Sequence, residues 1–210
     1  MRFLLGLPKS TELSKQLPKK AIYEKFNMSP QAKDKFDSDV SRIYIVAEIS
    51  PNTVNIDKGE TVPVIFVLQV LLKHKKFDPK TISQISKLID QKMLLVLDCD
   101  GERKLAIHHS KLIHSDWKSV DDCTVNLTGL NLDTVWENMI TQDGSIEIEQ
   151  GHSLDEQIAA DEQKAKLLKE IARLEKLAKK EKQPKKKFEI FNEIKKLTDL
   201  YKDCSREVNS

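Results

Sequence analysis

The stretch from residue 154 to residue 182 contains neither glycine nor proline, and it restricts the fold more than any other part of the chain. Ser153 and Glu156 form a capping box at its start, which marks the beginning of a helix. Its apolar residues then step by four, three and four positions, the spacing of a coiled-coil seam. These residues are Leu167, Ile171, Leu174 and Ala178. We expect this helix to project, because at about 1.5 Å per residue it is too long to lie along a small sheet.

A second helix is predicted after Gln183-Pro184, where the proline ends the first one. Its apolar residues repeat the same steps and are Ile190, Ile194, Leu197 and Tyr201. Further apolar residues flank the two seams: Leu168, Leu177, Phe188, Phe191 and Leu200. Two amphipathic helices around one proline are typical of a helical hairpin. The sequence therefore predicts a coiled-coil-like helical hairpin over residues 151–210.

The two seams supply the candidate partner-binding residues. These are Leu167, Ile171, Leu174, Ile194 and Leu197. A seam that stays exposed binds another helix, either in a partner protein or in a second copy of the chain as a homo-oligomer. The alternative is that these side chains pack only against each other inside the hairpin.

Lysines surround the predicted tip of the hairpin and form a candidate nucleic-acid-binding cluster. The candidates are Lys179, Lys180, Lys182, Lys185, Lys186 and Lys187. Such a cluster binds phosphates of DNA or RNA without regard to sequence, through counterion release. The alternative is a solvated helix turn, because no aromatic residues interleave with the lysines to stack on bases. The net charge of the whole chain is only +2, so any attraction to nucleic acid must come from local clustering.

Residues 29–150 alternate helix and strand patterns, which predicts an α+β domain with an antiparallel sheet and packed helices. Ser29-Pro30 and Asp78-Pro79 each place an N-cap before a proline at a helix start. Asp100-Gly101 predicts a tight hairpin between two strands. In the turn between the strands predicted at 42–50 and 62–73, Gly59 is expected to be left-handed.

Two other segments accompany this domain. Residues 1–28 are expected to be a lead-in segment, in which Leu7-Pro8-Lys9 begins a turn and Pro18 begins a helix that carries Ile22. This is favoured over an arm that grips DNA, since its lysines are spread along the segment. Residues 116–148 are expected to form short helix and loop that close the core with Trp117, Leu127, Leu130, Leu132, Val135 and Trp136.

The residues that could carry catalysis do not form a recognised set. His108 and His109 are adjacent, so on a strand they point to opposite faces. A divergent Mg-dependent nuclease would use Glu48, Asp98 and Lys73, but the spacing departs from that of such sites, with Gln69 where a metal ligand should stand. No phosphate-binding glycine loop or nucleophile elbow occurs. We predict no catalytic residue, no metal site and no cofactor, and hence not an enzyme.

Cysteine usage and hydropathy indicate the compartment. The three cysteines, Cys99, Cys123 and Cys204, are scattered and form no metal-ligand spacing, which favours a reduced environment. The apolar run from Val62 to Leu72 is about half the length of a membrane helix. The expectation is a soluble cytoplasmic protein that does not act in a membrane.

Five segments together carry a family resemblance. They are LPKSTELSKQLPKKAIYEKF at 7–26, ISPNTVNI at 49–56, DPKTISQISKLIDQKMLLVL at 78–97, LDTVWENMI at 132–140, and the hairpin sequence at 154–197. The chain resembles a bacterial and archaeal family, domain of unknown function 4391, which has no assigned catalytic residues. The resemblance implies a companion of DNA methyltransferases and helicases in type III-like restriction-modification and phage-defence clusters. The expected role is an accessory subunit that docks such a partner.

Overall fold

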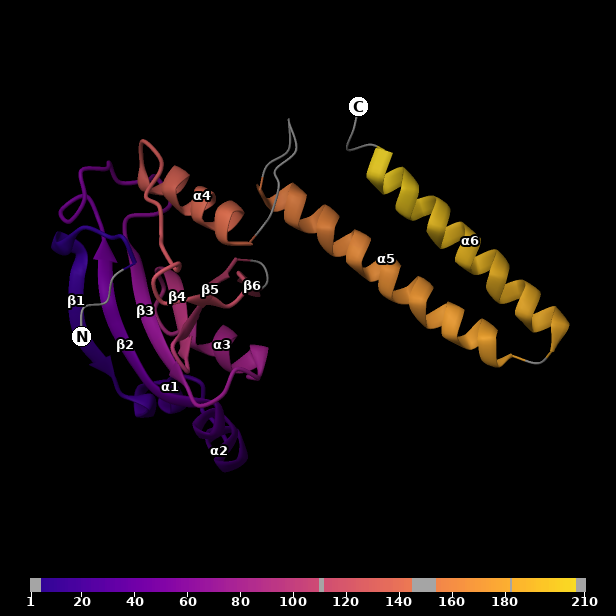
Figure 1. Ribbon diagram of the computed structural model, residues 1–210, viewed down its shortest axis with the longest axis horizontal. Coiled ribbons are helices and arrows are strands. Elements are labelled where there is room, and N and C mark those ends of the chain that lie inside the picture. The colour runs from indigo at the N-terminus through magenta and orange to yellow at the C-terminus, as the bar shows by residue number, and fades with distance from the viewer. Residues whose placement is uncertain (1–4, 110–111, 145–153, 182, 207–210) are drawn as a thin grey trace. The chain divides into compact units, whose positions relative to one another are not determined.

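The computed structural model describes residues 5–109, 112–144, 154–181 and 183–206 of the chain (Figure 1). The chain divides into two compact units, Met1–Ile146 and Glu147–Ser210, which we call unit 1 and unit 2. Each unit has its own secondary structure, so each is described by itself. None of the described helices is both long enough and apolar enough to cross a membrane.

Unit 1 is built on a sheet whose strands follow chain order, with a short seventh strand paired to the fifth. The strands are β1 (Glu12–Leu17), β2 (Val40–Ile49), β3 (Ile65–Leu72), β4 (Lys92–Cys99), β5 (Glu102–His108), β6 (Leu112–His114) and β7 (Lys118–Ser119). All pairs are antiparallel except β3 and β4, which are parallel. The α+β prediction is confirmed. The sheet is mixed because α3 (Pro79–Ile85) returns the chain between β3 and β4.

Local signals set the starts of these elements. In α2 (Pro30–Asp39), the Ser29 hydroxyl accepts a hydrogen bond from the Ala32 N–H at 3.3 Å. In α3, the Asp78 carboxylate accepts from the Lys80 N–H at 2.9 Å. Asp100 and Gly101 have positive φ angles of 51° and 80°, which the turn of a tight hairpin requires. These three predictions are confirmed.

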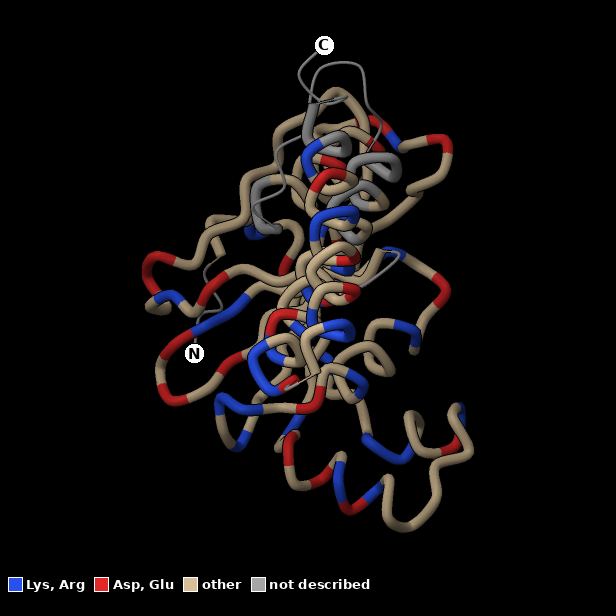
Figure 2. Tube along the Cα trace, turned by 90° about the vertical axis from the view of Figure 1, so that its right-hand side faces the viewer, with Lys and Arg blue, Asp and Glu red and all other residues tan. Residues whose placement is uncertain are grey.

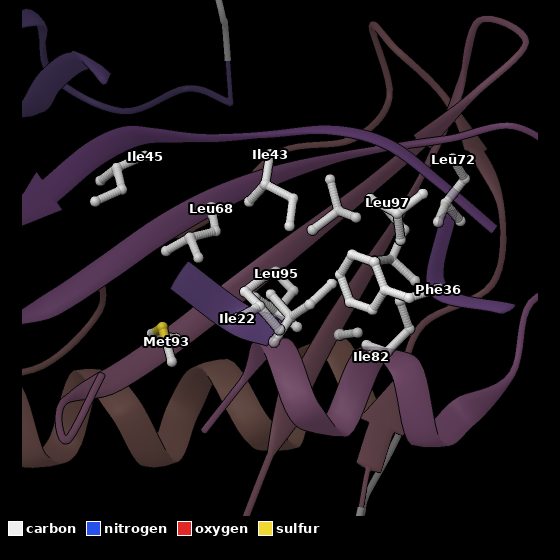
Figure 3. Packing of buried hydrophobic residues seen from close by; sticks show 14 of the residues in the cluster. Ile22, Phe36, Ile43, Ile45, Leu68, Leu72, Ile82, Met93, Leu95 and Leu97 are labelled. Atoms are coloured by element: carbon white, nitrogen blue, oxygen red, sulfur yellow. The ribbon is translucent and has the colours of Figure 1, made fainter. Parts of the chain in front are cut away.

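One face of the sheet packs against α1 (Lys19–Lys25), α2 and α3. Each helix brings a large apolar side chain to the sheet: Ile22, Phe36 and Ile82 (Figure 3). They meet alternate residues of the central strands, among them Leu68, Leu72, Met93, Leu95 and Leu97. Period-two alternation along a strand gathers these side chains on one face.

The residues of the central strands whose side chains point to the opposite face of the sheet are buried as well. Its members include Ile65, Val67, Leu94, Val96, Leu105 and Ile107. Helix α4 (Leu132–Gly144) contacts β5 and β6 and contributes buried Leu132, Val135 and Trp136. Trp117 and Leu127 are only half-buried. The prediction that Leu130 closes the core is wrong, since Leu130 is 90% exposed in the bend before α4.

The N-terminal segment is more than a lead-in. After a short 3-10 turn, η1 (Lys9–Thr11), it forms β1, which pairs antiparallel with β2 at the edge of the sheet. The side chains of β1 are exposed except for that of Leu17. Edge pairing through the main chain needs no apolar alternation, so the sequence pattern did not reveal this strand.

A carboxylate clamp fixes the loop between β2 and β3. Asp133, in the first turn of α4, accepts hydrogen bonds from the N–H groups of Glu60 at 2.6 Å and Val62 at 2.8 Å, and from the Thr61 hydroxyl at 2.8 Å. These donors, the Thr61 hydroxyl foremost, lower the pKa of Asp133. The clamp is therefore complete at neutral pH and weakens as pH falls through the lowered pKa.

Gly59 makes room for this clamp. Its φ is not positive, so the prediction of a left-handed residue is wrong. A Cβ at position 59 would lie 2.8 Å from the backbone nitrogen of Asp133. The glycine is needed for the close approach of α4 and not for its conformational freedom.

Unit 2 contains α5 (Leu154–Lys180) and α6 (Pro184–Arg206), which contact each other as a helical hairpin. Pro184 is the first residue of α6, where proline fits because its missing N–H would be unpaired there in any case. The predicted capping residue Ser153 and the tip residue Lys182 lie outside the described residues. The helical hairpin itself is confirmed.

Candidate interaction site on the helical hairpin

The predicted partner-binding seam lies along the inner sides of α5 and α6. Leu174 is buried, with 4% of its surface exposed, and Ala178 is also buried. The remaining seam residues are half-buried: Leu167, Ile171, Ile190, Ile194, Leu197 and Tyr201. Because the two helices contact each other, part of this seam serves the hairpin itself. That Leu167, Ile171, Leu174, Ile194 and Leu197 bind a partner stays a prediction.

Apolar side chains beside the seam are much more exposed. Leu168, Leu177, Phe188, Phe191 and Leu200 are 48%, 43%, 67%, 51% and 46% exposed, and we call them the flank residues. Each residue of an α-helix is turned by about 100° from its neighbour. Leu168 follows seam residue Leu167 and Leu177 precedes Ala178, so they lie on opposite sides of the seam. The hairpin therefore presents apolar surface on both of its sides.

The tip of the hairpin is strongly basic. Between residues 176 and 187 there are seven lysines and one acidic residue, Glu181. Figure 2 shows the Lys and Arg positions of the described chain in blue and the Asp and Glu positions in red. The candidate lysines at the tip are exposed where the structure describes their side chains: Lys179, Lys180, Lys185, Lys186 and Lys187. The Glu181 carboxylate accepts a hydrogen bond from the Gln183 N–H at 2.8 Å, in the connection between the helices. The Glu181 carboxylate thus stabilises the turn.

Exposed aromatic side chains lie beside these lysines, although none interleaves with them in the sequence. Phe188 and Phe191 are exposed in the first turns of α6, directly after Lys185, Lys186 and Lys187. Phe191 also lines a pocket of about 310 Å³ between the helices, with Glu175, Ala178, Lys179 and Lys187. The amphipathic pattern assigned both phenylalanines to an apolar flank, and only the exposed fractions show that the flank is uncovered.

An exposed ion pair lies on the surface of α5. The Arg173 guanidinium donates two hydrogen bonds to the Glu170 carboxylate, at 2.9 and 2.6 Å, and this lowers the pKa of Glu170. The Glu170 carboxylate, and more weakly the negative charge of Glu193 on α6, raise the pKa of Arg173. An exposed pair of this kind within one helix contributes little stability.

The candidate nuclease residues of unit 1 do not come together. Glu48 pairs with Phe66 on β3, whereas Asp98 pairs with Leu71, five residues further along that strand or about 16 Å away. Glu48 accepts a hydrogen bond from the Ser50 hydroxyl at 3.1 Å. Lys73 follows the end of β3 and donates its backbone N–H to Asp39. The three side chains therefore share no common site.

Asp98 belongs to a polar group that the sequence analysis missed. It accepts hydrogen bonds from the Gln69 amide at 2.9 Å and from the buried Arg103 guanidinium at 3.2 Å. The sequence contains the information needed to find this group, because a two-residue hairpin at Asp100-Gly101 places Asp98 opposite Arg103. A carboxylate paired in this way neutralises a buried arginine. Among the described residues, no group of three His, Cys, Asp or Glu side chains could hold a metal ion.

Comparison with protein-family models identifies a family for this chain. The model described as "Domain of unknown function (DUF4391)" matches residues 5–200, which include both units. Searches of the curated proteins and of the solved structures gave no match.

Proposed function

The chain belongs to the DUF4391 family, and we propose that it is a non-catalytic accessory subunit of a bacterial DNA restriction-modification or phage-defence complex. In this role the helical hairpin docks a DNA methyltransferase or helicase subunit. Unit 1 is the folded body that carries the docking arm. The type of partner follows from the family resemblance, and the docking surface follows from the hairpin.

The uncovered flank residues are the observation that carries this proposal. The hairpin already buries Leu174 and Ala178 between its helices, yet five large apolar side chains remain 43–67% exposed. Single exposed apolar residues are ordinary on protein surfaces, but clustered ones mark interaction sites. An amphipathic helix presents such residues to a partner groove or to further helices.

The polar groups of unit 1 favour a structural over a catalytic role. Asp98 is engaged by Gln69 and Arg103, and Asp133 is engaged by the loop that it clamps. Catalytic groups are commonly held in clefts, with pKa values shifted toward their working pH. The pKa values of Asp37, Asp78 and Asp133 are instead lowered, which is the sign of carboxylates stabilised in the charged form.

Capture from the native cell tests the proposed function. The tagged full-length chain should retain a DNA methyltransferase or a helicase subunit in near-stoichiometric amount, identified by mass spectrometry. A Leu130→Glu variant should retain the same protein, because Leu130 is an exposed apolar residue of unit 1 outside the hairpin. Retention of no protein, or of a protein unrelated to DNA modification and helicase activity, would contradict the proposal.

Non-specific nucleic-acid binding by the hairpin tip is the second candidate function. The exposed phenylalanines Phe188 and Phe191 beside Lys185, Lys186 and Lys187 favour it. Single-stranded nucleic acid is bound by this combination, in which lysines meet phosphates and aromatic rings stack on bases. The basic tip could serve this purpose while the flanks dock a protein.

Charge reversal at the tip tests this second candidate. Changing Lys185, Lys186 and Lys187 to Glu should weaken binding of an unstructured oligonucleotide and reduce its salt slope by about 0.7 for each phosphate that these lysines neutralise in the wild type. Phe188→Ala should weaken binding by about 1–3 kcal/mol per stacked base. The matched control reverses Lys195, Lys196 and Lys202, exposed lysines of α6 away from the tip. Fluorescence anisotropy at several salt concentrations measures both quantities, and absence of wild-type binding at low salt would exclude this function.

A further inference from the structure

We propose that unit 1 binds a compact phosphate-bearing ligand in a pocket between the segment that follows α3 and the end of β5. This site is separate from the helical hairpin and from the proposed docking function. We call it the His108 pocket, and its principal lining residues are Ser86, Lys87, Asp90, Lys92, Met93 and His108.

The pocket has one apolar wall and a polar mouth. Met93, at the start of β4, is buried, while Lys87 is exposed and His108 is half-buried. Its volume of about 290 Å³ lies at the lower end of the range for small-ligand sites. This space fits a phosphate with a few further atoms, such as a sugar phosphate.

Two lysines and one histidine of the pocket come from three separate segments. Lys87 follows α3, Lys92 begins β4, and His108 ends β5. Lys87 and His108 line the same pocket. The Lys92 ammonium lies 5.7 Å from the centre of the Trp136 ring. Two lysines and a histidine that line one space can supply charge-assisted hydrogen bonds to an oxyanion.

One acidic residue lines the pocket, and a nearby lysine partly offsets its negative charge. Asp90 is the acidic residue of the lining, and its carboxylate lies 3.7 Å from the Lys25 ammonium. Thr61 also lines the pocket, but its hydroxyl donates to Asp133 in the clamp. The Asp133 clamp therefore holds one wall of the pocket in place.

The state of His108 gives the site a measurable signature. Burial, then the charge of Lys87 and more weakly that of His109, lowers the pKa of His108, while hydrogen bonds with the backbone at His108 and His109 act in the opposite direction. A bound anion would favour the imidazolium form and raise that pKa again. Binding and proton uptake are thus linked: protonation of His108 strengthens binding of a given phosphate anion, and the bound anion raises the pKa of His108.

NMR titration of the full-length protein tests the proposal. The pKa of His108 is measured from its imidazole resonances without ligand, with inorganic phosphate, with ribose 5-phosphate and with ribose. Phosphate and ribose 5-phosphate should raise the His108 pKa in a saturable way, and ribose should not. Tighter binding of ribose 5-phosphate would identify a phosphate monoester as the ligand class, and equal binding would identify the free anion. His74 and His114, which lie outside the pocket, should not respond.

Variants separate a built site from a general effect of ions. Lys87→Gln should raise the ligand-free pKa of His108 and weaken phosphate binding about tenfold, because it removes a charge-assisted hydrogen bond. Asp90→Asn should tighten binding. Lys104→Gln is the matched control, since the Lys104 ammonium lies over Trp117 instead. The proposal is overturned if His108 shows no saturable response, if His114 responds equally, or if Lys87→Gln binds phosphate as tightly as the wild type.

Discussion

Leu174→Asp should unfold the helical hairpin, whereas Leu177→Asp should leave it folded. Leu174 is 4% exposed, and Leu177, only three residues away on α5, is 43% exposed. Removing a buried leucine costs about 2–5 kcal/mol, and an unpaired buried carboxylate adds to this. A two-helix unit has a small core, so this loss should exceed its stability.

Hydrogen exchange of the full-length chain, read by mass spectrometry on peptides from α5 and α6, measures this difference. In Leu174→Asp these peptides should lose nearly all protection, while peptides from the sheet of unit 1 stay protected. In Leu177→Asp both sets should exchange as in the wild type. Equal protection of α5 in the two variants would show that the seam does not hold the hairpin together.

Gly59→Ala should destabilise unit 1 by about 1–3 kcal/mol, the usual cost of forcing an extra carbon into a filled space. The new Cβ would lie 2.8 Å from the backbone nitrogen of Asp133, and a backbone atom at the start of α4 cannot move aside as a flexible side chain can. Relief of the clash requires the carboxylate to leave the N–H groups of Glu60 and Val62. The variant therefore loses the clamp as well as its packing.

Urea unfolding of the full-length chain, followed by tryptophan fluorescence, measures this loss. Trp117 and Trp136 both belong to unit 1, so the signal reports on that unit. Gly101→Asn is the matched glycine control, because a Cβ there meets no atom within 4 Å and asparagine tolerates the positive φ of 80°. If Gly59→Ala is no less stable than Gly101→Asn, the clamp does not support unit 1.

The regular elements with strong local signals could be predicted from the sequence. The helical hairpin followed from the seam periodicity and from Pro184, and the β4–β5 turn followed from Asp100-Gly101. Elements that depend on their neighbours could not be predicted. Strand β1 is held by main-chain pairing at a sheet edge, and the parallel pairing of β3 with β4 depends on where α3 returns the chain. Gly59 was recognised as special, but the cause is Asp133, 74 positions further along the chain.

The exposed apolar surface of the helical hairpin was predicted only in part. Periodicity identifies which residues share a helix face, but it does not say whether the partner of that face is the other helix of the hairpin or another protein. Leu174 is buried and Leu177 is exposed, although both are leucines in the same amphipathic helix. The pattern placed Phe188 and Phe191 on an apolar flank of the helix, and the structure shows that both side chains are exposed. The His108 pocket joins three segments that only the fold brings together.

Docking through the flanks of the helical hairpin is most directly tested by capture with a variant of the full-length chain that carries Leu168→Glu, Phe191→Glu and Leu200→Glu. Hydrogen exchange should first show that α5 and α6 stay protected in this variant. We expect the methyltransferase or helicase subunit to be retained by the wild type and by Leu130→Glu, and to be lost from the triple variant. Equal retention by the triple variant would contradict docking through the flank residues and would place the partner elsewhere on the chain.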